Sequence, residues 1–414
     1  MRIVICPHSM EFGGSQRNAI DIATSLRARG NDVLVFSPPG PLVTLLRERG
    51  LRHEPAPRPR IRPSPAVMRR LCAVVDEMDA EIVHAFEWPP AVEAIFGPLL
   101  RSNVPALCTV MSMAVAPFLP RELPLTVGTQ GLLRSEQGRR ARVTLLEPPV
   151  DTLHDSPQDQ RESKRKLGID EDTLVVSMVT RLARELKREG ILTAISAVGA
   201  LASEFPVRLV IAGDGPVHGE VEAAARAANE AAGAEAVTLT GNLADPRPVY
   251  DAADIALGMG GSALRSMAFR KPLVVQGEQG YWRLLDADSL GGFVDQGWYG
   301  IGDGSDGATR LGAILRPLLA DASLRAALGS FSRATVDSRY GLEAATTRLE
   351  GLYGDVIRAH RSQPSRGSRL LGSYLAVTRY DLERKLRRRL LGVSSDDFNS
   401  ITAMQHQADG SRSS

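Results

Sequence analysis

The residues best suited to chemistry in this 414-residue sequence are cations and glycines that follow apolar runs. The segment "VTRLARELKREG" places Arg181 just after an apolar run and Lys187 six residues later. An arginine fork and a lysine point charge beyond a strand can clamp a diphosphate and stabilise charge on a phosphate leaving group. Taken alone, the two residues fit a solvated basic loop better than a diphosphate clamp.

A glycine-rich turn points to the same kind of ligand. In "DIALGMGGSALRSMAFRKPLVV", residues 254–275, an apolar run leads through a turn into an expected helix that carries Arg265. The turn residues are Gly258, Gly260, Gly261 and Ser262. The free N–H groups of a helix start bind phosphate. The turn also matches G-x-G-x-x-A with Glu278 about 20 residues on, but that dinucleotide fingerprint normally sits on the first strand of its domain.

Weaker candidates lie elsewhere at expected strand ends. Gly13 and Gly14 in "MEFGGSQRNAI" would allow close approach of a ligand, or simply form a tight turn. Gly213 in "VIAGDGP" is expected mainly to shape the backbone. His84 in "EIVHAFEW" ends an apolar run, where it would orient a sugar or an acceptor, or serve as a structural histidine.

The sequence gives little support for a metal site, a disulfide or a hydrolase triad. Asp286 and Asp288 form a "DAD" pattern, but the preceding "YWRLL" reads as a helix, so we expect a solvated turn and no metal site. The three cysteines have no metal-ligand spacing, which favours reduced, buried thiols in a cytoplasmic protein. No cofactor is expected, and no Ser-His-Asp or Cys-His set has a meaningful spacing.

The elements that must position these residues alternate between short β-branched runs and helical patterns. Such alternation predicts an α/β fold with parallel sheets, whose ligands sit at the carboxyl ends of the strands. A polar stretch at residues 151–172 interrupts the alternation, which then restarts. Two doubly wound domains in tandem therefore fit better than one large sheet, with helices after residue 312.

Charge and composition exclude several classes of partner. A net charge of +2 and 5% aromatic residues argue against nucleic-acid binding. No window approaches the ~20 apolar residues of a membrane helix, and the N-terminus reads as a strand rather than a signal peptide.

The C-terminal region adds a basic amphipathic pattern. In "LLGSYLAVTRYDLERKLRRRLLG", five leucines share one helical face opposite a basic cluster. Such a helix would contact an anionic membrane peripherally, or dock on its own protein with a solvated basic face. We expect the preceding Ser-, Arg-, Gly- and Pro-rich segment, residues 362–372, to be a linker and the last residues to be disordered.

The order of nine segments across residues 1–358 resembles retaining glycosyltransferases of family 4, which have the GT-B fold. The segments include "GGSQRNAIDIATSLRARGNDV", "EIVHAF", "VTRLARELKREG", "LVIAGDGP", "VYDAADIAL" and "ALRSMAFRKPLVV". The resemblance implies two Rossmann-like domains facing each other across a cleft. It implies an acceptor-side domain over residues 1–160, a nucleotide-sugar domain over 161–335 and a helix crossing back over 336–360, followed by the linker, basic helix and tail over 361–414.

The resemblance also implies a reaction: metal-independent, retaining transfer of a sugar from a nucleotide diphosphate sugar to an unknown acceptor. Arg181 and Lys187 match positions that contact the donor diphosphate, and Gly13 and Gly14 match the loop facing it. The family's paired glutamates are absent, and Arg265 stands where the second is expected. Either Glu278 and Arg265 rebuild the donor site, which we favour, or the chain is a silent nucleotide-binding partner; a nucleotide-sugar epimerase is the other enzymatic alternative.

Overall fold

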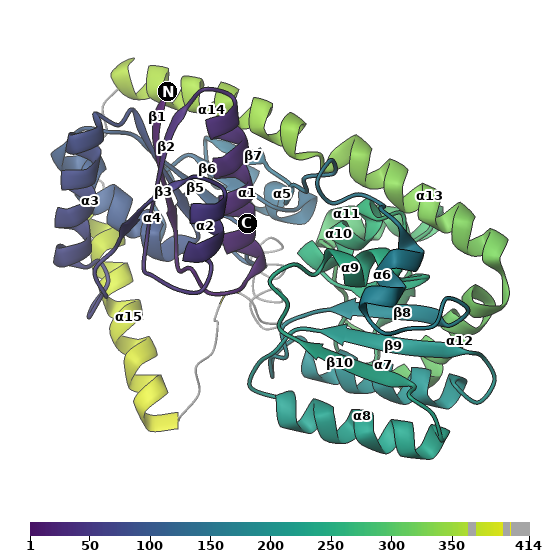
Figure 1. Cartoon of the computed structure of the whole chain (residues 1–414). Coiled ribbons are helices and arrows are strands. Elements are labelled where there is room, and N and C mark those ends of the chain that lie inside the picture. Colours follow the sequence, from purple (N-terminus) through teal and green to yellow (C-terminus); the bar gives the residue numbers. More distant parts are fainter. Residues whose placement is uncertain (363–369, 392–397, 399–414) are drawn as a thin grey trace. The chain divides into compact units, whose positions relative to one another are not determined.

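The chain divides into two α/β units, the first made of residues 1–149 and 342–414 and the second of residues 150–341 (Figure 1). This computed structural model describes residues 1–362, 370–391 and 398. We had placed the first domain boundary after residue 160 and treated residues 336–360 as a separate crossing helix. The contacts put the boundary at residue 149 and assign the chain from Leu342 onward to the first unit.

Unit 1 is built on seven parallel strands in the order β3-β2-β1-β4-β5-β6-β7. The strands are β1 (Arg2–Pro7), β2 (Asp32–Ser37), β3 (Arg52–Pro55), β4 (Ile82–Phe86), β5 (Ala106–Val110), β6 (Leu125–Val127) and β7 (Val143–Leu145). The helices are α1 (Gly14–Ala28), α2 (Val43–Glu48), α3 (Pro65–Met78), α4 (Trp88–Ala94), the π-helix η1 (Ile95–Leu99), α5 (Gln130–Gln137), α14 (Leu342–Ser362) and α15 (Leu371–Leu391).

Both faces of the unit 1 sheet are covered, as strand periodicity requires. Along β1, Val4 and Cys6 join one buried cluster, whereas Ile3 and Ile5 join another on the opposite face. The second cluster includes six residues of α14, so this late helix completes the core of unit 1. The three cysteines are buried and unpaired.

Unit 2 has six strands in the order β10-β9-β8-β11-β12-β13, with only β13 antiparallel. The strands are β8 (Leu174–Val179), β9 (Val207–Ala212), β10 (Val237–Gly241), β11 (Ile255–Gly258), β12 (Leu273–Gln276) and β13 (Trp282–Leu284). The helices are α6 (Gln160–Lys166), α7 (Arg188–Leu201), α8 (His218–Ala232), α9 (Arg247–Ala252), α10 (Gly261–Ala268), α11 (Ala287–Gln296), α12 (Gly307–Ala320) and α13 (Ala322–Arg339).

Two local predictions in unit 2 were wrong. The segment "YWRLL" forms the edge strand β13 rather than a helix, pairing antiparallel with β12. The polar stretch at residues 151–172 is no simple break, because α6 forms within it, capped by the Asp159 side chain, and packs against α9. Asp254 pairs with the buried Lys164 of α6 at 3.1 Å, which ties this polar helix to the unit.

The C-terminal helix α15 forms as predicted but docks by a face that we did not expect. Leu370 and Val377 are buried against unit 1, whereas the five leucines of the predicted apolar face are exposed. Most of the predicted linker and nearly all of the predicted tail lie outside the described residues. None of the helices within the described ranges is both long and apolar enough to cross a membrane.

Candidate functional site

The carboxyl edge of the unit 2 sheet gathers most of the predicted site residues. Arg181 follows β8, Gly213 follows β9, Gly258 ends β11 and Glu278 follows β12, and these four strands are adjacent and parallel. The strand order reverses between β8 and β11, since β9 leaves β8 on one side and β11 lies on the other. Ligands of open α/β sheets bind at the carboxyl ends of strands at such a switch point.

The loop that carries Arg181 is braced by the turn after β9. Gly213 has φ +140°, and a Cβ there would lie 1.9 Å from the Thr180 carbonyl oxygen, so only glycine fits. The Leu182 N–H donates to the Asp214 carbonyl at 3.0 Å. The structure thus gives Gly213 a backbone role in placing this loop, and the Arg181 side chain is exposed.

Lys187 lies directly before α7, as its N-cap residue. Its side chain is only partly exposed, and burial lowers the pKa of its ammonium group to about 7. Among residues 1–362, 370–391 and 398, neither Lys187 nor Arg181 forms an ion pair or a side-chain hydrogen bond. A desolvated cation without a counter-ion favours an anionic ligand, which would restore the charged form.

The glycine turn after β11 leads into α10 as predicted. Gly260 adopts φ +54° and ψ −131°, and its N–H donates to the Trp298 carbonyl at 2.8 Å. The first intrahelical bond runs from Leu264 to Gly260, so the N–H groups of Gly261, Ser262 and Ala263 have no acceptor within the helix. The Ser262 hydroxyl instead bonds the Met259 carbonyl at 3.0 Å, which closes the turn.

Gln276, at the end of β12, connects the loop before α7 with the glycine turn before α10. The sequence did not predict this role. Its side chain is 1% exposed, and its Nε2 donates to the Leu186 carbonyl at 3.4 Å and to Met259 Sδ at 3.5 Å. Its Oε1 is buried without a hydrogen-bond partner in the described part of the chain. A polar residue ending the apolar run "PLVVQ" was the signal that could have identified it.

Glu278 is held in place by its neighbours. The Tyr299 hydroxyl donates to its Oε2 at 2.7 Å, and burial together with this bond raises the pKa of Tyr299. Glu189, in the first turn of α7, accepts from the N–H groups of Gln279 at 3.0 Å and Gly280 at 2.6 Å. Glu189 therefore fixes the loop after Glu278 to the helix that follows Lys187, a role that its position in the sequence does not reveal.

Arg265 is neutralised inside unit 2. Its Nε lies 3.2 Å from Asp155 Oδ2, and the two side chains are only 17% and 6% exposed. The sequence favours a role for Arg265 in a rebuilt donor site. This buried pair gives the arginine a structural partner 110 positions away in sequence.

Gly13, Gly14 and His84 belong to unit 1. The two glycines are exposed at the start of α1, where the Gly13 backbone is extended. His84 is fully buried on β4, with Nδ1 2.7 Å from the Tyr353 hydroxyl and Nε2 2.6 Å from Thr109 Oγ1. Burial lowers the pKa of His84 to about 3, so the ring stays neutral and links α14 to the sheet.

We expect Tyr353→Phe to destabilise unit 1 by about 1–3 kcal/mol, because a buried nitrogen of His84 loses its partner. The loss is measurable as a shift in a urea unfolding titration. Tyr374→Phe is the matched control, since that tyrosine is 37% exposed and its hydroxyl forms no hydrogen bond with any described residue. Equal stability of both variants would remove the linking role assigned to His84.

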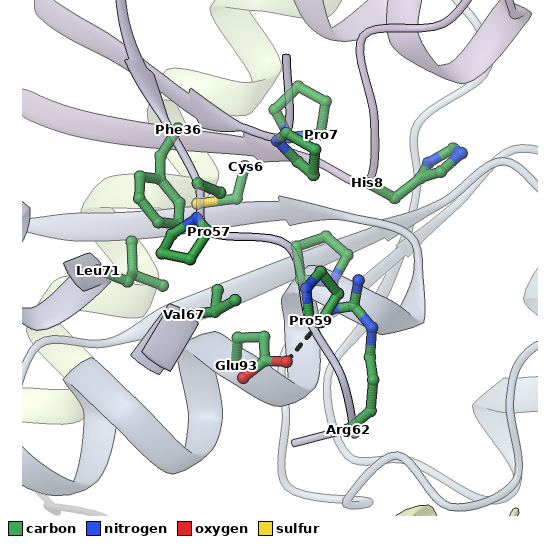
Figure 2. Close-up of a pocket in the computed structure, with 13 residues that line it drawn as sticks. Cys6, Pro7, His8, Phe36, Pro57, Pro59, Arg62, Val67, Leu71 and Glu93 are labelled. Carbon is green, nitrogen blue, oxygen red and sulfur yellow. Dashed lines mark hydrogen bonds and ion pairs between the residues drawn. The ribbon is translucent and has the colours of Figure 1, made fainter. Parts of the chain in front are cut away.

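A small cavity lies in unit 1 among residues near the ends of β1, β2 and β3 (Figure 2). Its volume is about 20 Å³, which is room for about one water molecule rather than a sugar. On its wall, Arg62 Nη1 lies 3.2 Å from Glu93 Oε1. Both Glu93 carboxylate oxygens also accept from the Ser64 N–H at 2.9 Å, so this charged pair fastens the segment before α3 to α4.

No group of three or more His, Cys, Asp or Glu residues suited to a metal ion occurs within the described ranges. Of the two "DAD" aspartates, Asp286 caps α11 through the Ser289 N–H at 2.8 Å, and Asp288 lies in the first turn of that helix. Asp286 therefore serves as the N-cap of α11.

Comparisons with known proteins agree with this architecture. Residues 12–144 match the family model "Glycosyltransferase Family 4", and residues 173–293 match "Glycosyl transferases group 1". A glycosyltransferase structure from Rickettsia africae has a TM-score of 0.68 at 15% identity, covering 86% of this chain and 98% of that one. Anabaena HepE in complex with UDP-glucose has a TM-score of 0.67 at 16% identity, covering 86% and 100%.

A third solved structure, WaaG, a glycosyltransferase involved in lipopolysaccharide biosynthesis, has a TM-score of 0.57 at 17% identity and covers 85% of this chain and 99% of that one. At such identities the likeness shows the fold alone. No curated protein is similar enough in sequence to count as a match.

The two Rossmann-like units and these structural neighbours show that the chain has the GT-B fold. The predicted fold class is therefore confirmed. In sequence the chain is similar to glycosyltransferases of family 4, because each unit contains a segment that matches a glycosyltransferase family model.

Proposed function

We propose that this protein transfers a sugar from a nucleotide diphosphate sugar to an acceptor, with the diphosphate bound at the carboxyl edge of unit 2. The observation that carries the proposal is a pair of cations, Arg181 and Lys187, that form no ion pair with any described residue and lie on the same sheet edge as the first turn of α10. Backbone N–H groups and fixed cations stabilise charge on a leaving diphosphate without reorganisation. Anabaena HepE, solved with UDP-glucose, supports a donor of this type.

Within this proposal, Lys187 and Arg181 hold the phosphates, and the turn from Gly258 to Ser262 presents N–H groups. Glu278 binds hydroxyls of the donor sugar through Oε1, which has no hydrogen bond within the described residues. The resemblance to family 4 places Gly13 and Gly14 in the loop that faces the donor, whereas the buried His84 has a structural role through Tyr353 and Thr109. Gly213 shapes the Arg181 loop, and Arg265 stabilises the start of unit 2 through Asp155.

The proposal also includes retention of anomeric configuration, independence from metal ions and a cytoplasmic location with peripheral membrane contact. The resemblance to family 4 supports retention, and the cations offer a substitute for a metal. Three buried, unpaired cysteines fit a reducing compartment. Retention predicts a product with the anomeric configuration of the donor by NMR, and metal independence predicts unchanged turnover in EDTA.

Arg181→Gln tests the donor site directly. We expect it to weaken nucleoside diphosphate binding by roughly 10- to 100-fold in calorimetric titrations, because it removes charged hydrogen bonds to phosphate. Arg184→Gln is the matched control, an exposed arginine in the same loop. Binding without turnover of any nucleotide sugar would support the silent-partner alternative, and no binding of any nucleoside diphosphate would contradict the proposed site.

A further inference from the structure

Helix α15 is docked on unit 1 through a polar and aromatic face. Asp381 is 2% exposed and accepts from the Arg62 N–H at 3.0 Å and from Lys385 Nζ. Lys385 also donates to the Arg60 carbonyl at 2.6 Å, and the Arg384 guanidinium lies 5.6 Å from the centre of the Trp88 ring. These contacts hold the helix firmly in one rotational setting.

Aromatic packing extends the same docked face. Tyr380 lies 5.6 Å from the ring of Trp88 and 5.0 Å from that of Phe118, and Tyr374 lies 5.2 Å from Phe96. Val377, which lies between Tyr374 and Tyr380 in sequence, is fully buried. Part of the basic cluster, Arg384 and Lys385, is therefore used to bind the helix to its own protein.

The leucine face of α15 consequently points to solvent. We define it as the five leucines that repeat at spacings of four and seven residues and are 56–72% exposed: Leu371, Leu375, Leu382, Leu386 and Leu390. At 1.5 Å per residue this face is about 29 Å long. An apolar stripe of that length on one helix is an interaction surface rather than scattered surface leucines.

The charges beside the leucine face identify the surface that it fits. Arg379 lies one turn from both Leu375 and Leu382, Arg389 lies one turn from Leu386, and both arginines are exposed. Of the acidic residues nearby, Asp381 is paired with Lys385, and Glu383 forms an exposed pair with Arg379 at 2.7 Å, which is weak enough for an anionic headgroup to replace the carboxylate. Leucines interleaved with arginines match an interfacial helix on an anionic bilayer, whose acyl chains take the leucines and whose headgroups take the cations.

The segment that follows α15 is poor in apolar side chains. Residues 399–414 contain only Ile401 and Met404 as large apolar side chains, too few for five leucines. We propose that the leucine face of α15 binds anionic lipid bilayers, with the opposite face of the helix fixed to unit 1. This names the surface responsible for the membrane contact included in the proposed function, and it does not depend on donor binding.

Flotation of the full-length protein with vesicles tests the proposal. We expect binding to phosphatidylcholine–phosphatidylglycerol vesicles and little binding to phosphatidylcholine alone. The double variant Leu382→Glu with Leu386→Glu should bind the anionic vesicles at least about 100-fold more weakly, because it puts two carboxylates where leucines meet acyl chains. Leu153→Glu is the matched control, since that leucine is 82% exposed in unit 2 and should leave binding unchanged.

A second arm tests the charges. Replacing Arg379 and Arg389 by glutamine should weaken binding to anionic vesicles about tenfold and reduce its salt dependence. All substituted side chains are exposed, so the thermal unfolding midpoint serves as a check that each variant folds. Lys187→Ala should lose nucleotide binding but keep vesicle binding, which separates this inference from the proposed catalytic function.

Two results would overturn the inference. One is wild-type protein that does not float with anionic vesicles at low salt. The other is wild-type protein that does not bind vesicles and sediments as a dimer, while the double leucine variant sediments as a monomer. The leucine face would then pair two copies of the chain.

Discussion

Lys187→Ala should lower kcat/KM for the nucleotide-sugar donor by about 100- to 1,000-fold. Lys187 is a partly buried cation with no counter-ion among the described residues, at the sheet edge where Arg181 and the start of α10 also lie. Removing one fixed electrostatic group that stabilises developing charge typically costs two to three orders of magnitude in rate. Steady-state kinetics with the donor identified from a nucleotide-sugar panel measures the effect.

The pH dependence gives this prediction a second signature. Because the pKa of Lys187 is about 7 in the unliganded protein, the side chain is mostly charged below pH 7 and mostly neutral above it. A bound diphosphate favours the ammonium form, so affinity for a nucleoside diphosphate should fall as pH rises above 7, and binding at pH 8 should take up a proton. Calorimetry in buffers with different ionisation enthalpies detects that proton.

Lys166→Ala is the control for charge loss, since that exposed lysine lies on α6 and pairs only with Glu162, at 3.8 Å. It should change neither turnover nor proton uptake. Unaltered turnover in Lys187→Ala, or proton uptake that persists without Lys187, would show that the diphosphate lies elsewhere.

Arg62→Met should destabilise unit 1 by about 3–5 kcal/mol at pH 8, because it strands a buried carboxylate. Glu93 is 1% exposed, and Arg62 is its ionic partner on the wall of the small cavity (Figure 2). Burial nevertheless raises the pKa of Glu93 to about 7. The pair therefore offsets part of the cost of burying the carboxylate.

The sign of the pH effect follows from these values. The pKa of Glu93 is about 7 in the folded protein, against 4.5 for an ordinary glutamate, so the folded state binds more protons between these values. The free energy of unfolding thus falls as pH rises through that window. Without Arg62 the folded pKa rises further and the fall continues to higher pH. The destabilisation by Arg62→Met should accordingly be smaller at pH 5 than at pH 8.

A urea titration followed by Trp88 fluorescence measures this change in unit 1. Trp282→Phe and Trp298→Phe would silence the other two tryptophans, which lie in unit 2. Arg58→Met, at an exposed arginine of the same loop, should have little effect. A destabilisation independent of pH would mean that lost packing, rather than the stranded carboxylate, accounts for the loss.

The long, strongly patterned elements were predictable from sequence, whereas short ones were not. Runs such as "RIVIC" and "LVVSMV" are almost entirely apolar because a parallel sheet buries both faces, and they form most of β1 and all of β8. The three residues of β13 are too few to show a strand period, and their pairing depends on β12. The apolar periodicity of α15 predicted the helix but not its docked face, which Trp88 and Arg62 determine from 300 positions away.

Within the site, the sequence predicted those residues that directly follow a strand. Arg181, Lys187 and the glycine turn each follow an apolar run, so their common sheet edge was predictable. The partner of Arg265 was not, because Asp155 precedes the whole sheet of unit 2. Nor could spacing show that Gln276 would bridge Leu186 and Met259, since that contact requires the packing of β12 beside β11.

The return of the chain to unit 1 after residue 341 has a consequence for biosynthesis. Unit 2 is continuous in sequence, so all of it is synthesised before α14. Until then the α1 side of the unit 1 sheet lacks Leu349, Tyr353 and Val356, and His84 lacks its hydroxyl partner. The chain of the second unit is therefore complete first, while the first unit stays incomplete and exposed to aggregation or proteolysis until α14 has been made.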